Sequence, residues 1–248
     1  MTLDEFFREN PKVALGFSGG VDSSYLLYAA QKAGAEVYAY YIQTAFQPRF
    51  EREDAARLAK QLGIRLNIIE LDVFAQAEVV ANPADRCYYC KRALFGTLAR
   101  RAAEDGCPVL MDGTNASDDA GDRPGMRALR ELSVRSPLRE AGLTKADIRR
   151  LSHEAGLFTW DKPAYACLAT RVPAGTPLDA ETLMRVEGAE TALFSLGYTD
   201  FRCRVFHGAA RLQFPAAQLE KAVHERAALR AALAPYFTTV LLDLTERG

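Results

Sequence analysis

The sequence predicts an α/β fold in which a parallel sheet carries helices on both faces, followed by a small α+β module. Two observations predict this class. Strand-like runs rich in β-branched and aromatic residues alternate with helical patterns over residues 1–156, and this alternation is typical of a parallel sheet with helical crossovers. Residues 176–248 instead show the order helix, strand, strand, helix, strand, which indicates a separate α+β module.

Each element follows from a local pattern. Apolar residues at helical spacing, with Gly63 or Gly156 just beyond them, predict two of the helices, and Thr144 is a good N-cap for the second of these. The helices expected in the first part span residues 1–10, 25–30, 50–62, 86–104 and 145–155, and the strands span 13–15, 36–44, 65–71 and 109–111. In the second part we expect helices at 179–196 and 216–234 and strands at 198–206, 209–214 and 237–244.

Two segments fit neither pattern. Residues 117–125 show no apolar periodicity, so we expect a surface loop there. Residues 158–171 hold the single tryptophan in an irregular run. The stretch 173–177, rich in proline, is the best candidate for a boundary, and we therefore expect one domain over residues 1–175 and a second over 176–248.

Composition argues against several classes of function. The 248 residues are 49% hydrophobic and 25% charged, as in ordinary globular proteins, and their formal net charge is −1. This balance lacks the basic excess of nucleic-acid-binding proteins. No apolar run approaches the length that spans a membrane, and the first residues lack the order of a signal peptide. We expect a cytoplasmic protein whose five cysteines serve as ligands, nucleophiles or core residues rather than as disulfides.

The turn Gly16–Ser24 is the strongest candidate for a binding site. A turn from a strand into a helix presents unpaired N–H groups and the positive end of a helix dipole, and both attract an anion. Gly19 and Gly20 let the backbone approach a phosphate closely, and Asp22 can hold Mg²⁺ on it. The segment after the strand 109–111 falls at the same sheet edge, where ligands bind in parallel sheets. The residues expected to contact the ligand are Gly16, Ser18, Gly19, Gly20, Asp22, Ser23, Ser24, Gly113 and Thr114.

This turn differs from two common nucleotide-binding loops. It lacks the lysine that closes G-x-x-x-x-G-K-[ST], and its glycine spacing is not G-x-G-x-x-G. An ordinary glycine-rich connection without a ligand is the alternative interpretation.

Cys87, Cys90 and Lys91 share one face of the expected helix 86–104, because they stand at positions i, i+3 and i+4. They also fall near its start, where the helix dipole favours thiolate over thiol. A C-x-x-C pair alone leaves a redox pair, half a zinc site and part of an iron–sulfur site open.

Cys167 has a different setting. It lies in an irregular segment between two cations, Lys162 and Arg171, which could lower the pKa of the thiol. A thiol in irregular polar backbone is more often functional than part of a core. We therefore single out Cys167 as a candidate nucleophile.

Arg202 and Arg204 fall on one face of the strand expected at 198–206, because side chains alternate along a strand. Cys203 falls on the opposite face, and we expect it in the core. Two arginines on one face could clamp a phosphate or a carboxylate. An ordinary solvated face is the alternative.

Together these segments resemble the LarE family of PP-loop proteins over nearly the whole chain. The motif S-G-G-V-D-S-S is similar to the PP-loop of ATP pyrophosphatases. Further matches are R-C-Y-Y-C-K, D-G-T-N-A-S-D-D, R-P-G-M-R-A, S-P-L-R-E-A-G-L-T-K, W-D-K-P-A-Y-A-C-L-A-T-R and F-R-C-R-V-F-H-G. The W-D-K-P segment is more discriminating than the PP-loop. One departure is R-C-R where the family has R-V-R.

The resemblance implies an adenine nucleotide alpha hydrolase-like PP-loop fold and an ATP-dependent sulfur transferase. Such enzymes cleave ATP between the α and β phosphates and adenylylate a substrate oxygen. The implied substrate is a small-molecule nucleotide, pyridinium-3,5-biscarboxylic acid mononucleotide. Its carboxylates become thiocarboxylates during synthesis of the nickel-pincer nucleotide cofactor.

The resemblance also implies roles for matching residues. Cys167 would attack the adenylylated carboxylate and form a thioester, and β-elimination would then release the thioacid and leave dehydroalanine. Lys91 and Arg171 would stabilise negative charge there. Arg202 and Arg204 would grip the phosphate of the substrate. The ATP phosphates and Mg²⁺ would be held by Ser18, Gly19, Gly20, Asp22, Ser23 and Ser24.

The cysteines divide the family. Some members carry only the sacrificial cysteine, whereas others are similar to three-cysteine proteins that hold a [4Fe–4S] cluster, whose fourth iron can bind external sulfide. The presence of Cys87, Cys90 and Cys167 favours the cluster type here, and sacrifice of Cys167 stays open. The resemblance further implies homo-oligomers, as trimers or hexamers.

Two other functions stay candidates. Another PP-loop ligase would thiolate tRNA or form an amide, although the near-neutral charge and the lack of an ammonia-generating domain argue against it. A non-catalytic nucleotide-binding module could use the C-x-x-C pair for zinc, although no second C-x-x-C or paired histidines complete such a site.

Overall fold

The computed structural model describes residues 1–118 and 124–247, and the chain packs into two compact units. The first unit comprises residues 1–75 and 85–162, and the second comprises 76–84 and 163–248. The stretch 173–177, where we expect a domain boundary, lies within the second unit. The functional division at residue 175 stays a prediction.

A four-stranded parallel sheet forms the centre of the first unit, in the order β3-β2-β1-β4. In the register, Leu15 of β1 lies between Ala39 of β2 and Met111 of β4. The four strands lie within one residue, at each end, of the runs expected from the sequence, so the expected parallel sheet is confirmed. Their bounds are β1 (Lys12–Gly16), β2 (Glu36–Gln43), β3 (Leu66–Glu70) and β4 (Val109–Met111).

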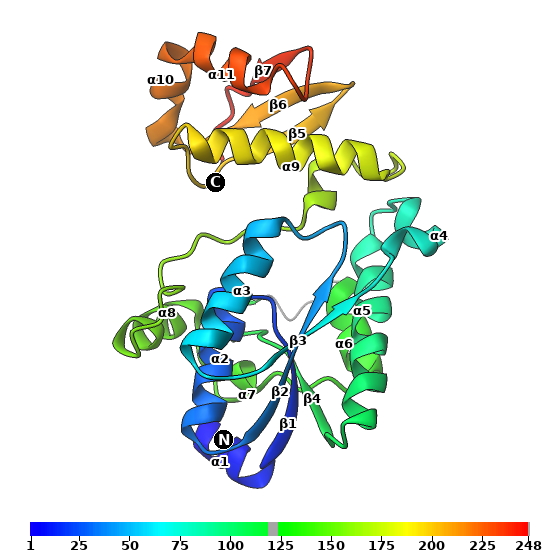
Figure 1. The fold of residues 1–248 in the computed structure, drawn as a ribbon, viewed down its shortest axis with the longest axis vertical. Helices are drawn as coiled ribbons and strands as arrows, with labels where there is room; N and C mark the ends of the chain where they lie inside the picture. The colour runs from blue at the N-terminus through cyan, green and yellow to red at the C-terminus, as the bar shows by residue number, and fades with distance from the viewer. Residues whose placement is uncertain (119–123, 248) are drawn as a thin grey trace. The chain divides into compact units, whose positions relative to one another are not determined.

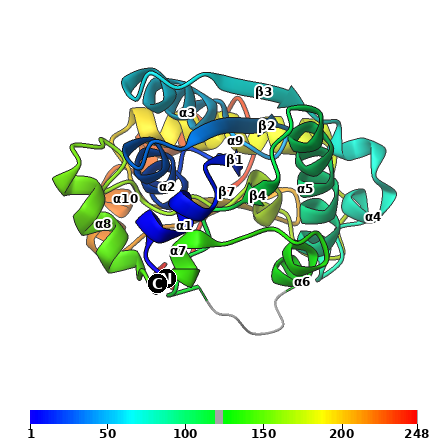
Figure 2. The ribbon, with the colours of Figure 1, turned by 90° about the horizontal axis from the view of Figure 1, so that it is seen from below.

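Helices cover both faces of this sheet (Figures 1 and 2). Side chains alternate along β1, so Val13 and Leu15 enter one core cluster while Ala14 enters another with Leu98. The first face carries α1 (Leu3–Glu9), α2 (Val21–Lys32), α3 (Arg49–Gln61), α7 (Pro137–Glu140) and α8 (Lys145–Glu154). The second carries α5 (Arg86–Glu104), and α6 (Pro124–Glu131) packs on α5.

Local side chains explain the starts of two helices. Thr2 and Thr144 each form a capping box, which satisfies N–H groups at the starts of α1 and α8. The helix α5 begins at residue 86 and ends at residue 104, as expected. The helix α2 begins at Val21, before the expected range 25–30, and it continues to Lys32.

The prediction of a loop over residues 117–125 is wrong at the end of that range. Pro124 and Gly125 begin α6, because proline is well tolerated in the first turn of a helix. Residues 119–123 lie outside the described residues. The sequence analysis also leaves out α6, α7 and two short helices in the part that precedes α5, which are η1 (Val73–Ala75) and α4 (Ala77–Val80).

The second unit contains the expected α+β module. Its sheet has the order β5-β6-β7, with β5 antiparallel to β6 and β6 parallel to β7. The strand expected at 198–206 begins only at Arg202, since Asp200 has a left-handed φ of 52°. The helix expected at 216–234 is interrupted at Glu225, which accepts a hydrogen bond from Tyr198. Besides α4, the elements of this unit are η2 (Leu168–Arg171), α9 (Ala180–Ser195), β5 (Arg202–Phe206), β6 (Ala209–Gln213), α10 (Ala216–His224), α11 (Arg226–Leu233) and β7 (Val240–Leu242).

Among the described residues, none of the helices combines the length and the apolar character needed to cross a bilayer.

Truncation of the same residue type at a buried and an exposed position tests the core. Leu26 of α2 is 0% exposed and Leu244 is 86% exposed. We expect Leu26→Ala to lower the free energy of unfolding by roughly 3 kcal/mol, because it leaves a cavity. Leu244→Ala should change it by less than about 0.5 kcal/mol. Urea denaturation measures both, and equal losses would contradict this placement of the core.

Candidate functional site

The turn Gly16–Ser24 connects β1 to α2 and is tied together by its own hydroxyls. Ser18 Oγ lies 3.0 Å from Ser23 Oγ and accepts a hydrogen bond from the Gly20 N–H at 3.3 Å. Ser23 Oγ accepts from the Ser18 N–H at 3.3 Å and donates to the Gly20 carbonyl at 3.2 Å. These contacts hold the shape of the loop.

Two glycines allow close backbone approaches at this loop. Gly19 has a φ of 73°, and a Cβ there would lie 3.0 Å from Ala55 of α3. After β4, a Cβ on Gly113 would lie 2.9 Å from the backbone nitrogen of Ser23. The end of β4 therefore lies against the first turn of α2, and the structure brings the two predicted segments together at one sheet edge.

Asp22 lies in the first turn of α2 and is surrounded by donors. Its Oδ2 accepts a hydrogen bond from Lys145 Nζ at 2.6 Å, and its Oδ1 accepts one from Asn115 Nδ2 at 3.4 Å. Burial raises the pKa of Asp22 above its usual value, and Lys145 only partly offsets this effect. A carboxylate at a helix N-terminus is suited to hold the Mg²⁺ that accompanies a polyphosphate.

The predicted residue Thr114 is engaged within its own loop. Its hydroxyl donates to Asp112 Oδ2 at 2.5 Å, and its N–H donates to Asp112 Oδ1 at 3.2 Å. Ser136 Oγ donates to the same carboxylate at 2.7 Å. Thr114 therefore shapes the segment beside the loop, while Gly113 supplies the close approach.

Ser24 tests whether these residues fit a phosphate. Its side chain is 0% exposed, and its hydroxyl has no hydrogen-bond partner among the residues that the structure describes. A buried hydroxyl without a partner is unfavourable, and a phosphate oxygen or its metal would satisfy it. With the glycine turn and Asp22, this orphan hydroxyl fits a nucleotide phosphate with Mg²⁺.

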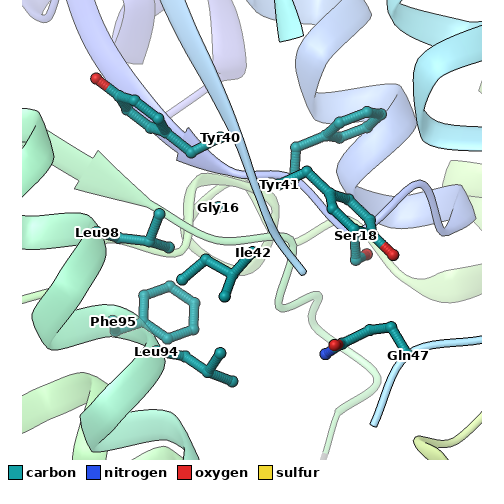
Figure 3. A pocket seen from close by; sticks show the side chains of 10 residues that line it. Gly16, Ser18, Tyr40, Tyr41, Ile42, Gln47, Leu94, Phe95 and Leu98 are labelled. Atoms are coloured by element: carbon teal, nitrogen blue, oxygen red, sulfur yellow. The ribbon is translucent and has the colours of Figure 1, made fainter. Parts of the chain in front are cut away.

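An apolar pocket of about 120 Å³ adjoins the loop, and the sequence analysis did not find it. Figure 3 shows Leu94, Phe95 and Leu98 of α5 on one side, and Tyr41 with its hydroxyl toward Ser18. Such walls suit a flat aromatic base. The spacing of the three α5 residues on one helix face was the signal that could have indicated it. The pocket is lined by Gly16, Phe17, Ser18, Tyr40, Tyr41, Ile42, Gln47, Leu94, Phe95 and Leu98.

Cys87 lies in the first turn of α5, and Cys90 and Lys91 follow in the second. Cys87 is exposed and Cys90 is half-buried. The Lys91 stem passes Gly125 so closely that a Cβ there would lie 3.1 Å from Lys91 Cδ. Among the described residues, no group of three or more His, Cys, Asp and Glu side chains is arranged to hold a metal ion. The cluster ligands therefore stay a prediction.

Cys167 lies in the second unit, half-buried, immediately before η2. Its carbonyl accepts hydrogen bonds from the Thr170 N–H at 2.9 Å and the Thr170 hydroxyl at 2.8 Å. We call the segment 164–171 the cysteine turn.

Lys162 belongs to the first unit, where its Nζ lies 2.7 Å from Asp54 and donates to the Gly19 carbonyl at 3.4 Å.

Arg171 is a buried structural cation of the cysteine turn. Its Nε lies 2.7 Å from Glu190 Oε1, and its Nη2 donates to Glu190 Oε2 at 3.1 Å. Its Nη1 donates to the Ala166 carbonyl at 3.0 Å and the Thr170 hydroxyl at 2.8 Å. Burial alone would lower the pKa of Arg171, but Glu190 raises it overall. These contacts support a positioning role, and stabilisation of negative charge by Arg171 stays a prediction.

Glu190 of α9 connects the cysteine turn to β5. Its carboxylate accepts hydrogen bonds from the Cys203 N–H at 2.9 Å and from the Tyr165 hydroxyl. Glu190 is 1% exposed and Cys203 is 0% exposed, as expected for a core residue. The sequence analysis missed Glu190, because a carboxylate in an amphipathic helix normally faces solvent.

Arg202 and Arg204 of β5 reach the two ends of the cysteine turn. Arg202 Nη2 donates to the Ala164 carbonyl at 2.9 Å, and Arg204 Nη1 donates to the Thr170 carbonyl at 2.8 Å. An ordinary solvated face is therefore the wrong alternative. Burial lowers the pKa of both, and the neighbouring charge of Arg171 adds to it. Arg171 pairs directly with the buried Glu190 carboxylate, whose charge also acts on Arg202 and Arg204. Such a cluster of guanidinium groups is suited to attract an anion.

The Arg171–Glu190 pair can be tested by a double-mutant cycle. We expect Glu190→Leu to lower the free energy of unfolding by about 3–5 kcal/mol, because it leaves a buried cation. Arg171→Met should have a similar effect, and the double variant should lose less than the sum by at least about 1 kcal/mol. Urea denaturation gives these values. Additive losses would show that the two groups do not depend on one another.

The chain is similar in sequence to several known proteins. Residues 12–85 match the family model described as queuosine biosynthesis protein QueC. An uncharacterized protein of Synechocystis is 37% identical over 90% of this chain and 84% of its own length. The tRNA-specific 2-thiouridylase MnmA of Pseudothermotoga lettingae is 27% identical over 41% of this chain and 36% of its own.

The pyridinium-3,5-bisthiocarboxylic acid mononucleotide synthase of Lactiplantibacillus plantarum is 33% identical over 88% of this chain and 80% of its own length. The match spans 220 residues, so it includes residues of both compact units. The chain therefore belongs to the family of that synthase, the LarE family of PP-loop proteins.

Proposed function

We propose that this protein is an ATP-dependent sulfur transferase that converts a carboxylate of pyridinium-3,5-biscarboxylic acid mononucleotide into a thiocarboxylate for the nickel-pincer nucleotide cofactor. The observation that carries the proposal is the 33% identity, over 88% of the chain, to a synthase named for the corresponding bisthiocarboxylic product. A loop that fits a nucleotide phosphate with Mg²⁺ and a half-buried thiol in a braced turn support it.

The first step activates the carboxylate. One carboxylate oxygen attacks the α-phosphorus of ATP, the bond to the pyrophosphate breaks, and an acyl adenylate forms. Loop N–H groups at the start of α2 would stabilise the negative charge of the phosphates, and Asp22 would hold the Mg²⁺. Lys91 would offset the negative charge at the reacting carboxylate. AMP then becomes the leaving group that the carboxylate itself lacks.

The second step transfers sulfur. The Cys167 thiolate attacks the acyl carbon, AMP leaves with the bonding electron pair, and a thioester forms. A base then removes the Cα proton of Cys167, and the Cβ–S bond breaks. The thiocarboxylate departs with the sulfur, and dehydroalanine remains in the chain.

The alternative sulfur source is an iron–sulfur cluster held by Cys87, Cys90 and Cys167. When bound, such a cluster supplies external sulfide and leaves the protein unconsumed. The two sources differ in what happens to the mass of the protein, so one measurement separates them.

The positive excess on the cysteine turn supports binding of the substrate phosphate. The resemblance assigns this phosphate to the guanidinium groups of Arg202 and Arg204, and Arg204, which is half-buried, is held in place by Gln213 and by the Thr170 carbonyl. Oligomerisation is part of the same proposal, since large apolar side chains such as Met184 and Val223 are exposed in the second unit.

Loss of the thiol should separate the two chemical steps. We expect Cys167→Ala to release pyrophosphate from Mg-ATP and the dicarboxylate mononucleotide, but to form no thiocarboxylate in product mass spectra. Cys107→Ala is the control, because Cys107 is a buried residue outside the turn. If Cys167→Ala still forms the thioacid, both sulfur routes fail. Thiolation of tRNA with no change in the mononucleotide would instead support a tRNA ligase.

Intact protein mass after anaerobic turnover identifies the source of sulfur. Loss of H₂S from Cys167 supports sacrifice, and an unchanged mass with added sulfide supports the cluster. Cys87→Ala and Cys90→Ala should leave a single sacrificial turnover unchanged, whereas they should abolish repeated turnover on a cluster.

Substitution of Arg204 in β5 should act on substrate binding. We expect Arg204→Gln to raise the KM for the mononucleotide about tenfold or more, because a charge-assisted phosphate contact contributes roughly 1.5–3 kcal/mol. The KM for ATP should change little. Steady-state pyrophosphate release measures both. Equal increases in the two KM values would place Arg204 outside the substrate phosphate site.

A further inference from the structure

We propose that Lys145 is the internal counter-ion of Asp22, and that Mg²⁺ displaces it when the nucleotide binds. The metal then binds well only together with the nucleotide, and the released ammonium contacts the phosphates. This inference rests on the proposed use of ATP at the loop.

The contact geometry places a cation where the metal would bind. Lys145 Nζ lies 2.6 Å from Asp22 Oδ2, and Asn115 occupies the other oxygen at 3.4 Å. Mg²⁺ binds carboxylate oxygens at about 2.0–2.1 Å. An ammonium and a divalent cation repel one another on the same oxygen, so the lysine competes with the metal.

The backbone of Lys145 is fixed while its side chain can move. Lys145 is the first residue of α8, its N–H donates to Ser117 Oγ at 2.9 Å, and the Thr144 capping box holds the helix start. The lysine side chain is 34% exposed and that of Asp22 is 22% exposed. Water and a metal therefore have access to the pair, and the four-carbon stem can swing from a fixed base.

The charges around Asp22 explain why a counter-ion is needed without nucleotide. The carboxylate is partly buried, Asp118 adds the effect of a negative charge, and Arg149 adds a smaller effect of a positive charge. A nucleotide with Mg²⁺ adds several phosphate charges and a divalent cation at once. The Asp22 carboxylate then binds the metal, and the ammonium group of Lys145 contacts the phosphates, which carry more negative charge.

The contrast with Lys162 shows that Lys145 has a distinct place. Lys162 is 14% exposed and is held by Asp54 and by the Gly19 carbonyl, both of which stay available when a metal binds Asp22. Lys162 therefore supports the loop, whereas the partner of Lys145 is the carboxylate that the metal takes.

Two affinities that should move in opposite directions test the proposal. The first is binding of Mn²⁺ to the nucleotide-free protein, followed by electron paramagnetic resonance. The second is binding of the magnesium complex of α,β-methylene-ATP, followed by calorimetry. We expect Lys145→Met to tighten binding of the bare metal about fivefold and to weaken binding of the nucleotide complex about fivefold.

Matched variants separate this role from a structural one. Lys145→Arg keeps the charge and should leave both affinities near those of wild type. Arg150→Met removes a cation of the same helix that pairs with Asp147 and Glu154, and it should change neither affinity. In Asp22→Asn, acetylation of Lys145 by acetic anhydride should be faster than in wild type, which tests the pair without altering the lysine.

The outcomes distinguish the two proposals. If wild type binds no nucleotide complex, the proposed function fails and this inference fails with it. If wild type binds the complex but Lys145→Met weakens both affinities, or changes neither, only the counter-ion role is overturned. Unchanged acetylation of Lys145 in Asp22→Asn would overturn it as well.

Discussion

The absence of a side chain at Gly113 is the constraint on which the candidate site of the first unit depends, because it lets the segment after β4 pack against the start of α2. A Cβ there would lie 2.9 Å from the backbone nitrogen of Ser23, a separation that real structures do not tolerate. Because β4 is the parallel neighbour of β1, their carboxyl ends share one edge. The segment after β4 can then extend along the start of α2, so that Asn115 reaches Asp22 and Ser117 holds Lys145.

In the second unit, the corresponding constraint is a buried charge pair. Transfer of an arginine and a glutamate from water is expensive, and their attraction repays it only when the geometry is good and the other donors and acceptors are satisfied. Arg171 and Glu190 meet this condition through contacts with Ala166, Thr170 and Cys203. The Ala166 carbonyl and the Thr170 hydroxyl, which lie on either side of Cys167 in the chain, are thereby fixed, so the pair defines the position of the thiol more than it adds stability.

Sequence patterns predicted the elements whose residues interact locally. The strands β1 to β4 are runs of strand-forming residues, and α8 carries its own capping box at Thr144, so both follow from neighbouring side chains. The Lys145–Asp22 pair joins positions 123 residues apart, and no local period indicates it. The break at Glu225 also escaped prediction, because its contact with Tyr198 comes from outside the helix.

The two candidate sites differ in how their charges are balanced, and this difference has a chemical consequence. Asp22 is paired with Lys145 within the first unit, so under the proposed function this carboxylate becomes available to a metal only when Lys145 is displaced. In the second unit, Arg171, Arg202 and Arg204 exceed the charge of Glu190 without any metal. This arrangement supports the proposed contact between the cysteine turn and the phosphate of a nucleotide monophosphate. Under the proposed function, the first unit would bind its anion together with a metal and the second unit would bind its anion without one, although the formal net charge of the chain is only −1.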